Sequence, residues 1–133
     1  MATERSTPRT ELSAFCEQLR RLRIRPERLL LFGSWARGQQ GDDSDIDVVV
    51  VSQDFAGKGL RRRLELLGIA AGHALVPVQA LGYTPKELAS PEPASFLAMV
   101  LSEKTVEIPI RKTGTPKRGT PGRRKSTVNG LRR

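Results

Sequence analysis

Residues 29–52 constrain the fold of this chain more than any other segment. They combine a short apolar run, a glycine-serine pair and two aspartates that head a run of four valines. The aspartates, Asp45 and Asp47, are two residues apart, so on a β-strand they point to the same face with Cα atoms about 6.6 Å apart. Paired carboxylates in this arrangement can bind common cations, and oxygen ligands suit Mg²⁺. The valine run predicts a strand covered on both faces.

Gly33 and Ser34 stand between the apolar residues 29–32 and a short helix expected over residues 34–38. Backbone N–H groups at a helix start can donate to phosphate oxygens, glycine lets a phosphate come close, and the serine hydroxyl adds a donor. Arg37 is a further candidate for phosphate contact, with a solvated or carboxylate-paired arginine as the equal alternative. Singly, these motifs are also typical of an ordinary turn and an acidic loop. Together they favour phosphoryl or nucleotidyl transfer with two metal ions.

Three short motifs of this segment belong together: Gly33-Ser34, Ala36-Arg37-Gly38 and Ser44-Asp45-Ile46-Asp47. They resemble the signature of the minimal nucleotidyltransferases, small members of the polymerase beta superfamily, and the resemblance extends more loosely over residues 12–110. It implies a nucleotidyltransferase fold, Mg²⁺ in a two-metal site, and ATP or another nucleoside triphosphate as substrate. On these positions it implies metal binding and catalysis by Asp45 and Asp47, and phosphate binding by Gly33 and Ser34.

The main departure from this family lies in the third expected strand. Members usually carry a third carboxylate five residues before the threonine of a Thr-Pro helix start, and counting back from Thr84 gives Gln79. In the family that carboxylate helps to hold the metal that activates the acceptor hydroxyl, and helps to remove its proton. No Asp or Glu occurs between Glu65 and Glu87 to replace it. We therefore expect the protein to bind the catalytic cation less tightly, and to lose less affinity for the cation that arrives with the nucleotide. Nucleotide binding can then persist in a protein that has lost catalysis.

The resemblance implies transfer of a nucleoside monophosphate to a protein or other hydroxyl acceptor. Many family members pair with a small helical HEPN-domain protein as its antitoxin, and some adenylylate that partner, which implies a toxin–antitoxin role. The alternative is a catalytically degenerate module that binds a nucleotide or a partner without transfer. A third hypothesis is a nucleic-acid-associated protein that uses a basic tail.

The composition sets outer limits on these functions. A chain of 133 residues corresponds to one domain with a modest core. The single cysteine, Cys16, excludes an intramolecular disulfide, and its apolar neighbours predict a buried thiol. No apolar stretch approaches the ~20 residues that span a bilayer, and the N-terminal residues lack the apolar core of a secretory signal. We expect a soluble, cytoplasmic protein without membrane contact.

The net charge of +9 is concentrated at one end of the chain. Nine of the 23 Lys and Arg lie in residues 111–133, which contain no Asp or Glu, so residues 1–110 carry equal numbers of basic and acidic side chains. This tail is rich in Gly, Pro and Thr, a composition that predicts disorder. It can bind nucleic acid weakly and without sequence preference through phosphates. The favoured alternative is a solvated extension with only incidental affinity for polyanions. Residues 1–9 are expected to be a flexible N-terminus.

Hydrophobic periodicity predicts an α/β domain over residues 10–110, with a small mixed sheet flanked by helices. The helix expected over residues 59–72 has its arginines on the solvent-exposed face. Its expected inward face consists of Leu60, Leu64, Leu67 and Ala71. Thr84 and Glu87 predict a capping box. The expected helices are 10–23, 34–38, 59–72, one starting at 85, and 93–101; the expected strands are 29–32, 46–52, 76–81 and 105–108.

Overall fold

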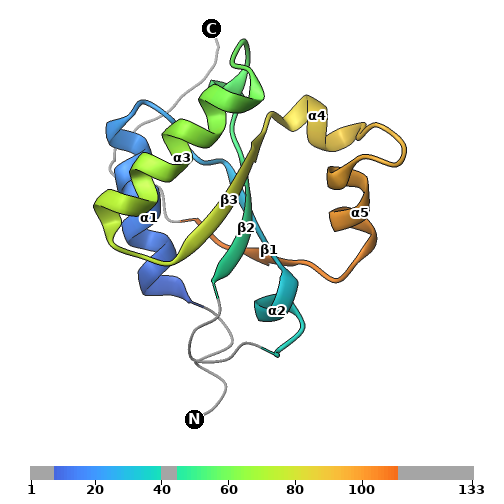
Figure 1. Cartoon of the computed structure of the whole chain (residues 1–133), viewed down its shortest axis with the longest axis horizontal. Helices are drawn as coiled ribbons and strands as arrows, with labels where there is room; N and C mark the ends of the chain where they lie inside the picture. The colour runs from blue at the N-terminus through green and yellow to red at the C-terminus, as the bar shows by residue number, and fades with distance from the viewer. Residues whose placement is uncertain (1–7, 40–44, 111–133) are drawn as a thin grey trace, which may run out of the picture.

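The computed structural model describes residues 8–39 and 45–110, so the basic tail and residues 1–7 lie outside the described part of the chain. Within it, helices and strands follow one another along the chain, and Figure 1 labels all five α-helices and the strands β1, β2 and β3. They are α1 (Arg9–Arg21), β1 (Arg28–Phe32), α2 (Gly33–Ala36), β2 (Ile46–Val51), the 3₁₀ turn η2 (Gln53–Phe55), α3 (Leu60–Ala74), β3 (Val78–Tyr83), α4 (Pro85–Ala89), α5 (Phe96–Ser102) and β4 (Val106–Ile108).

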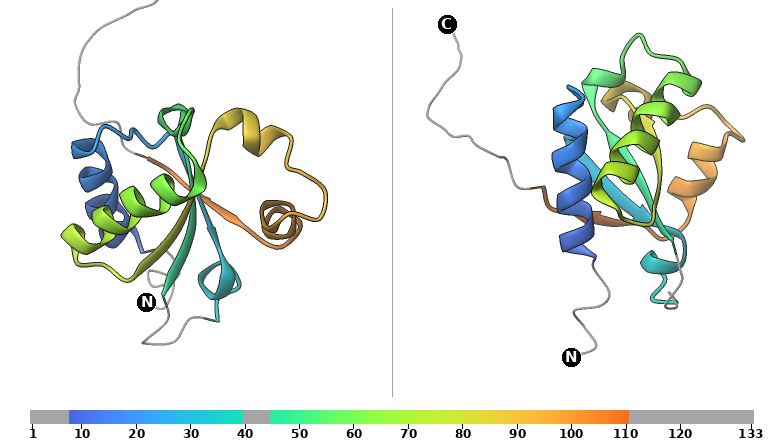
Figure 2. Two further views of the ribbon diagram at one scale, coloured as in Figure 1. Left: turned by 45° about the horizontal axis from the view of Figure 1, so that its top comes forward. Right: turned by 60° about the vertical axis from the view of Figure 1, so that its left-hand side comes forward.

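The four strands form one mixed sheet in the order β3-β2-β1-β4. Strand β1 pairs antiparallel with both β2 and β4, whereas β2 and β3 are parallel. Helices α1 and α3 cover one face, and α4 and α5 lie on the other (Figure 2). This arrangement confirms the α/β fold with a small mixed sheet. None of the helices in the described ranges is long and apolar enough to cross a bilayer.

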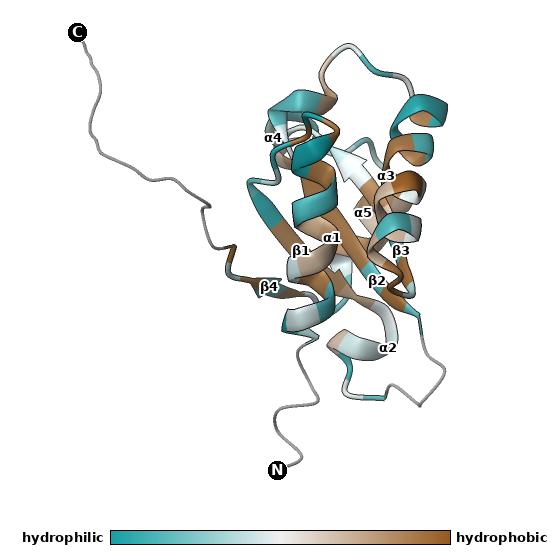
Figure 3. Cartoon of the chain, turned by 90° about the vertical axis from the view of Figure 1, so that its left-hand side faces the viewer, coloured by the Kyte–Doolittle hydropathy of each residue, from teal (hydrophilic) through white to brown (hydrophobic). Residues whose placement is uncertain are grey.

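Strand β2 is the centre of the core. Val48 and Val50 pack with α1 and α3, while Val49 and Val51 belong to a second cluster with Val100 of α5. All four β2 valines are fully buried, which confirms the strand covered on both faces. In Figure 3, the central strands and parts of the helices around them are coloured as hydrophobic. A strand held from both sides is a rigid support for the aspartates at its start.

Helix α1 matches its sequence pattern. Leu12, Phe15, Cys16 and Leu19 are buried along one side, and the helix begins one residue earlier than expected, at Arg9. Burial removes water from the Cys16 thiol and raises its pKa to about 11. The thiol therefore stays protonated and acts as a small apolar side chain.

The expected inward face of α3 was wrong in two positions. Leu60 is 64% exposed and Leu64 is 43% exposed, whereas the buried residues are Arg63, Leu66, Leu67 and Ala70. The helix is rotated relative to the expected orientation, because Arg63 turns inward and binds partners on three other segments. The sequence pattern had predicted Arg63 on the solvent-exposed face. Its guanidinium donates to the carbonyl oxygens of Lys58 and Gly82 and to the carboxylate of Glu87. Those acceptors make the burial of a charged side chain tolerable.

Several element boundaries also differ from the sequence expectation. Strand β3 begins at Val78 and ends at Tyr83, two residues later at each end, and α3 runs two residues further to Ala74. Helix α5 starts at Phe96, after Ser95 caps it by accepting from the N–H of Ala98. The capping box of α4 is confirmed: the Thr84 hydroxyl accepts from the N–H of Glu87, whose carboxylate accepts from the N–H of Thr84.

Candidate functional site

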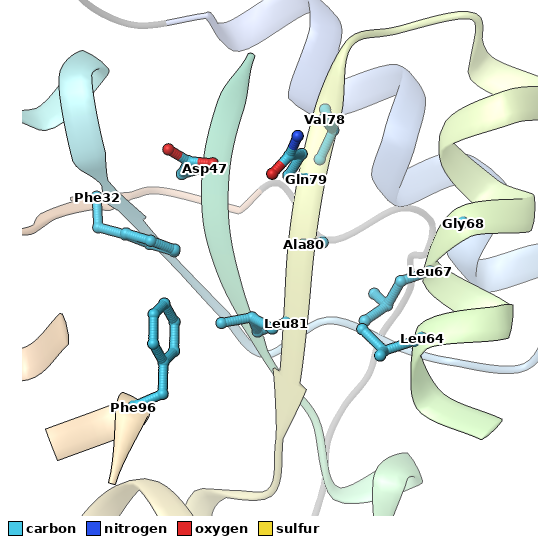
Figure 4. Close-up of a pocket in the computed structure, with 10 residues that line it drawn as sticks. All are labelled: Phe32, Asp47, Leu64, Leu67, Gly68, Val78, Gln79, Ala80, Leu81 and Phe96. Carbon is cyan, nitrogen blue, oxygen red and sulfur yellow. The ribbon is translucent and has the colours of Figure 1, made fainter. Parts of the chain in front are cut away.

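Asp45 and Asp47 lie where β2 begins, at the edge of the molecule from which α2 projects. Asp47 is the second residue of β2 and half-buried, and Asp45 directly precedes the strand and is exposed. The strand register places Asp47 opposite Phe32 of β1 and opposite Gln79 of β3. Directly paired residues share one face of a sheet. Asp47 and Gln79 accordingly lie side by side on the same face as Phe32 (Figure 4).

Gln79 joins the two aspartates. Its side-chain Nε2 donates to Oδ2 of Asp45 at 2.7 Å, and its backbone is paired with Asp47. The residue found by counting back from Thr84 is therefore the one that stands beside both carboxylates. A glutamine amide at this place supplies a hydrogen-bond donor where a third carboxylate would supply a negative oxygen. In residues 8–39 and 45–110, no group of three His, Cys, Asp or Glu side chains converges.

The electrostatics of the pair fit a bound cation. The pKa of Asp47 is raised above its ordinary value, first because burial removes water from the carboxyl group, and then because the negative charge of Asp45 is close. The positive charge of Arg37 acts in the opposite direction. A divalent cation would relieve this repulsion, and two carboxylates plus phosphate oxygens are a typical ligand set for Mg²⁺. The residues present fit one such cation well, and a second one less well because of Gln79.

Gly33 brings the backbone turn against this carboxylate pair. Its φ is +70°, a conformation that side-chain-bearing residues rarely adopt. A Cβ atom at this position would also collide with Oδ2 of Asp47. Only glycine therefore allows the first turn of α2 to approach Asp47 so closely. Since α2 has only four residues, it is a single helical turn rather than a long helix with a large dipole.

Ser34 and Arg37 complete this turn. Ser34 is half-buried, and its carbonyl oxygen accepts from the N–H of Gln39 at 2.8 Å. Arg37 is exposed, and its Nε donates to the side-chain oxygen of Gln39 at 3.1 Å. The arginine is thus held next to the turn, close enough for its charge to act on Asp47. The structure thus brings Gly33 and Arg37 close to Asp47, and Ser34 follows Gly33 in the same turn.

A cavity of about 490 Å³ runs along β3 beside Asp47 and continues round this strand to residues of α3. On the face that carries Asp47 and Gln79, its apolar walls come from Phe32 of β1, Leu81 of β3 and Phe96 of α5 (Figure 4). Sequence reasoning missed this cavity. The place of Phe32 follows from strand alternation with the buried Leu30, but Phe96 reaches the cavity only because α5 folds back onto the sheet.

Comparisons with known proteins agree with this fold. A family model described as a nucleotidyltransferase domain matches residues 11–106. A solved structure from Sulfolobus solfataricus, reported as a candidate nucleotidyltransferase, superposes with a TM-score of 0.56 at 19% identity over 86% of this chain and 92% of that one. A toxin–antitoxin structure with AMP-PNP gives a TM-score of 0.48 at 22% identity over 76% of this chain and 72% of that one. No curated protein sequence matches significantly. With the domain model matching most of its length, this chain belongs to the nucleotidyltransferase domain family of the polymerase beta superfamily.

Proposed function

We propose that this protein binds Mg²⁺ and a nucleoside triphosphate, ATP foremost, and transfers the nucleoside monophosphate to a hydroxyl group of a protein or other acceptor. The observation that carries the proposal is the contact between the Gly33 turn and the Asp47 carboxylate. It supports the proposal because a turn whose backbone N–H groups can donate to phosphate then lies beside a carboxylate that can bind Mg²⁺. A triphosphate that a divalent cation links to the protein needs donors for its phosphate oxygens and carboxylates for the cation, close to one another.

Each residue has a defined part in this proposal. Asp45 and Asp47 hold the cation, which neutralises the triphosphate when bound. The N–H groups of the Gly33 turn, the Ser34 hydroxyl and the Arg37 guanidinium orient the phosphates. The acceptor oxygen forms a bond to the α-phosphorus, the bond between the α- and β-phosphates breaks, and pyrophosphate leaves with that electron pair. The acceptor proton passes to solvent, because Gln79 cannot take it.

The alternative function is a degenerate module that binds a nucleotide or a partner protein without catalysis. The hydrogen bond from Gln79 to Asp45 favours it. The amide has no negative charge for a second cation, and it occupies one oxygen of Asp45 that a metal would otherwise use. In the form implied by the sequence resemblance, the partner is a small helical HEPN-type toxin, and the protein is its antitoxin with or without transfer.

The test is incubation with Mg²⁺, ATP labelled at the α-phosphate, and candidate acceptor proteins. The double variant Asp45→Asn/Asp47→Asn removes the carboxylate pair, and Glu92→Gln/Glu103→Gln removes two exposed acids elsewhere as a charge-matched control. Label transfer by the wild type and the control, but not by the first variant, supports the enzyme. Nucleotide binding without transfer, with transfer gained in Gln79→Asp, supports the degenerate module. A wild type that transfers no label and binds neither the nucleotide nor any of the candidate proteins contradicts both.

The basic tail is a separate proposal. Residues 111–133 bind nucleic acid through phosphates, while the α/β domain folds without them. Deleting the tail is expected to leave cooperative melting intact and to abolish salt-dependent binding to a generic RNA or DNA duplex. Nucleic-acid binding that survives the deletion would mean that the folded domain, and not the tail, carries the binding site.

A further inference from the structure

We propose that the ring of Phe96 is the platform on which the base of the bound nucleotide stacks. This inference rests on the proposed function and deepens it, because it assigns the base site that neither the signature motifs nor the comparisons indicate. The motifs account for the phosphates and the cation. They leave the apolar part of the cavity without a ligand.

The first argument is position. Phe32 is the residue immediately before the Gly33 turn, and it is paired with Asp47 across the sheet. Its ring meets that of Phe96 edge to face, with centroids 6.3 Å apart and planes at 72°. This geometry is favourable for two aromatic rings and holds Phe96 in one orientation. A flat group bound against Phe96 is thus one side chain away from the proposed phosphate turn.

The second argument is exposure. Phe96 is 51% exposed although its neighbours Leu97 and Val100 are buried in the core. These two residues anchor α5 on the sheet, so the helix holds Phe96 at the rim of the cavity. A large aromatic side chain that is both fixed and half-exposed can stack on a ligand without first losing much conformational freedom.

The third argument is the shape and chemistry of the cavity. The cavity of about 490 Å³ runs round the edge strand β3, and half of its lining residues lie on the α3 side of that strand. The part on the side of Asp47 is the part proposed for the nucleotide. There the lining has one carboxylate and one amide, from Asp47 and Gln79, and apolar walls from Phe32, Leu81 and Phe96. A triphosphate alone would use only the polar end. A nucleotide uses both, with the charged part at the aspartates and the flat base against the phenylalanine.

Stacking of this kind has a consequence for specificity. Every base presents a π-face, so stacking on Phe96 tolerates all four bases and favours the larger purines. The protein is therefore expected to bind ATP and GTP with similar dependence on Phe96, and pyrimidine nucleotides more weakly.

The experiment is calorimetric titration of the full chain, in the presence of Mg²⁺, with a non-hydrolysable ATP analogue and separately with inorganic tripolyphosphate. Phe96→Ala is expected to weaken nucleotide binding roughly tenfold and to leave tripolyphosphate binding unchanged. Met99→Ala is the matched control, because Met99 is 48% exposed one turn later on α5 and lies outside the cavity. It is expected to change neither affinity.

Two further variants separate stacking from simple burial. Phe96→Tyr keeps an aromatic face and is expected to retain nucleotide affinity, whereas Phe96→Leu keeps apolar bulk without a π-face and is expected to lose it. Far-ultraviolet circular dichroism checks that each variant is folded. If Phe96→Ala binds the nucleotide as tightly as the wild type, or if both probes weaken equally, the base platform is refuted while the proposed function stands. A wild type that binds neither probe refutes both.

Discussion

Replacing Glu87 by glutamine tests how the buried charge of Arg63 is held. The Arg63 side chain is only 11% exposed, and its Nη1 and Nη2 donate to the two carboxylate oxygens of Glu87 at 2.7 and 3.0 Å. Its remaining donors reach the carbonyl oxygens of Lys58 and Gly82, and the guanidinium carbon lies 5.7 Å from the centroid of the Phe55 ring. Glutamine keeps the size of the side chain, and its Oε1 can keep the capping-box hydrogen bond. The substitution removes the charge and turns an amide N–H toward Nη2 of Arg63, which is itself a donor.

The expected loss of stability follows from these contacts. Removing one partner of a buried ion pair costs about 3–5 kcal/mol. The cost is smaller here, because the Glu87 side chain is 42% exposed and water screens part of the interaction, and because Arg63 keeps two carbonyl acceptors. We expect Glu87→Gln to lower the free energy of unfolding by about 2 kcal/mol at neutral pH. Urea denaturation measures this as a lower midpoint with an unchanged slope.

The pH dependence gives a second readout. Hydrogen bonds from Arg63 are the main cause that lowers the pKa of Glu87 in the folded protein. A carboxyl group with a lowered folded pKa stabilises the fold above its unfolded pKa, and this stabilisation is lost as the pH falls through the lower folded value. The difference between wild type and Glu87→Gln should therefore shrink and vanish in acid. Equal stability at neutral pH, or a difference that does not shrink as the pH falls below the usual glutamate pKa, would refute the reasoning.

Three further predictions concern single positions. Gly33→Ala is expected to lower the free energy of unfolding by about 1–3 kcal/mol, because Gly33 has a positive φ and an added Cβ would meet the Asp47 carboxylate. The variant should also bind nucleotide more weakly. A thermal melting temperature equal to that of the wild type would contradict the predicted loss of stability. Gly82→Ala places a Cβ only 2.6 Å from the Phe55 ring and should cost about 1–3 kcal/mol in urea denaturation, unless the ring moves freely. Cys16 should react with a thiol reagent only when the protein unfolds, since burial raises its pKa to about 11; rapid labelling of the native protein would show an accessible thiol.

Local patterns determined a large part of this protein. The apolar stripe of α1, the doubly covered valines of β2 and the capping box at Thr84 all follow from spacings of a few residues, because helix and strand periodicity decides which side chains share a face. These inferences held because each depends on the geometry of one element and its nearest turn. Strand alternation also put Asp45 and Asp47 on one face at the start of β2, whereas Gln79 was reached only from the pattern of the family that the sequence resembles.

Contacts between distant segments could not be obtained in this way. The inward rotation of α3 depends on Arg63 finding acceptors as far as 24 residues along the chain, and the hydrogen bond from Gln79 to Asp45 spans 34 residues. The cavity exists because Phe96 returns to Phe32 across the sheet. The sequence by itself determined the elements and the chemistry at the head of β2, whereas tertiary packing decided which distant side chains surround that chemistry. The physical reason is that burial and hydrogen bonding are settled by the whole folded chain, while periodicity reports only one element at a time.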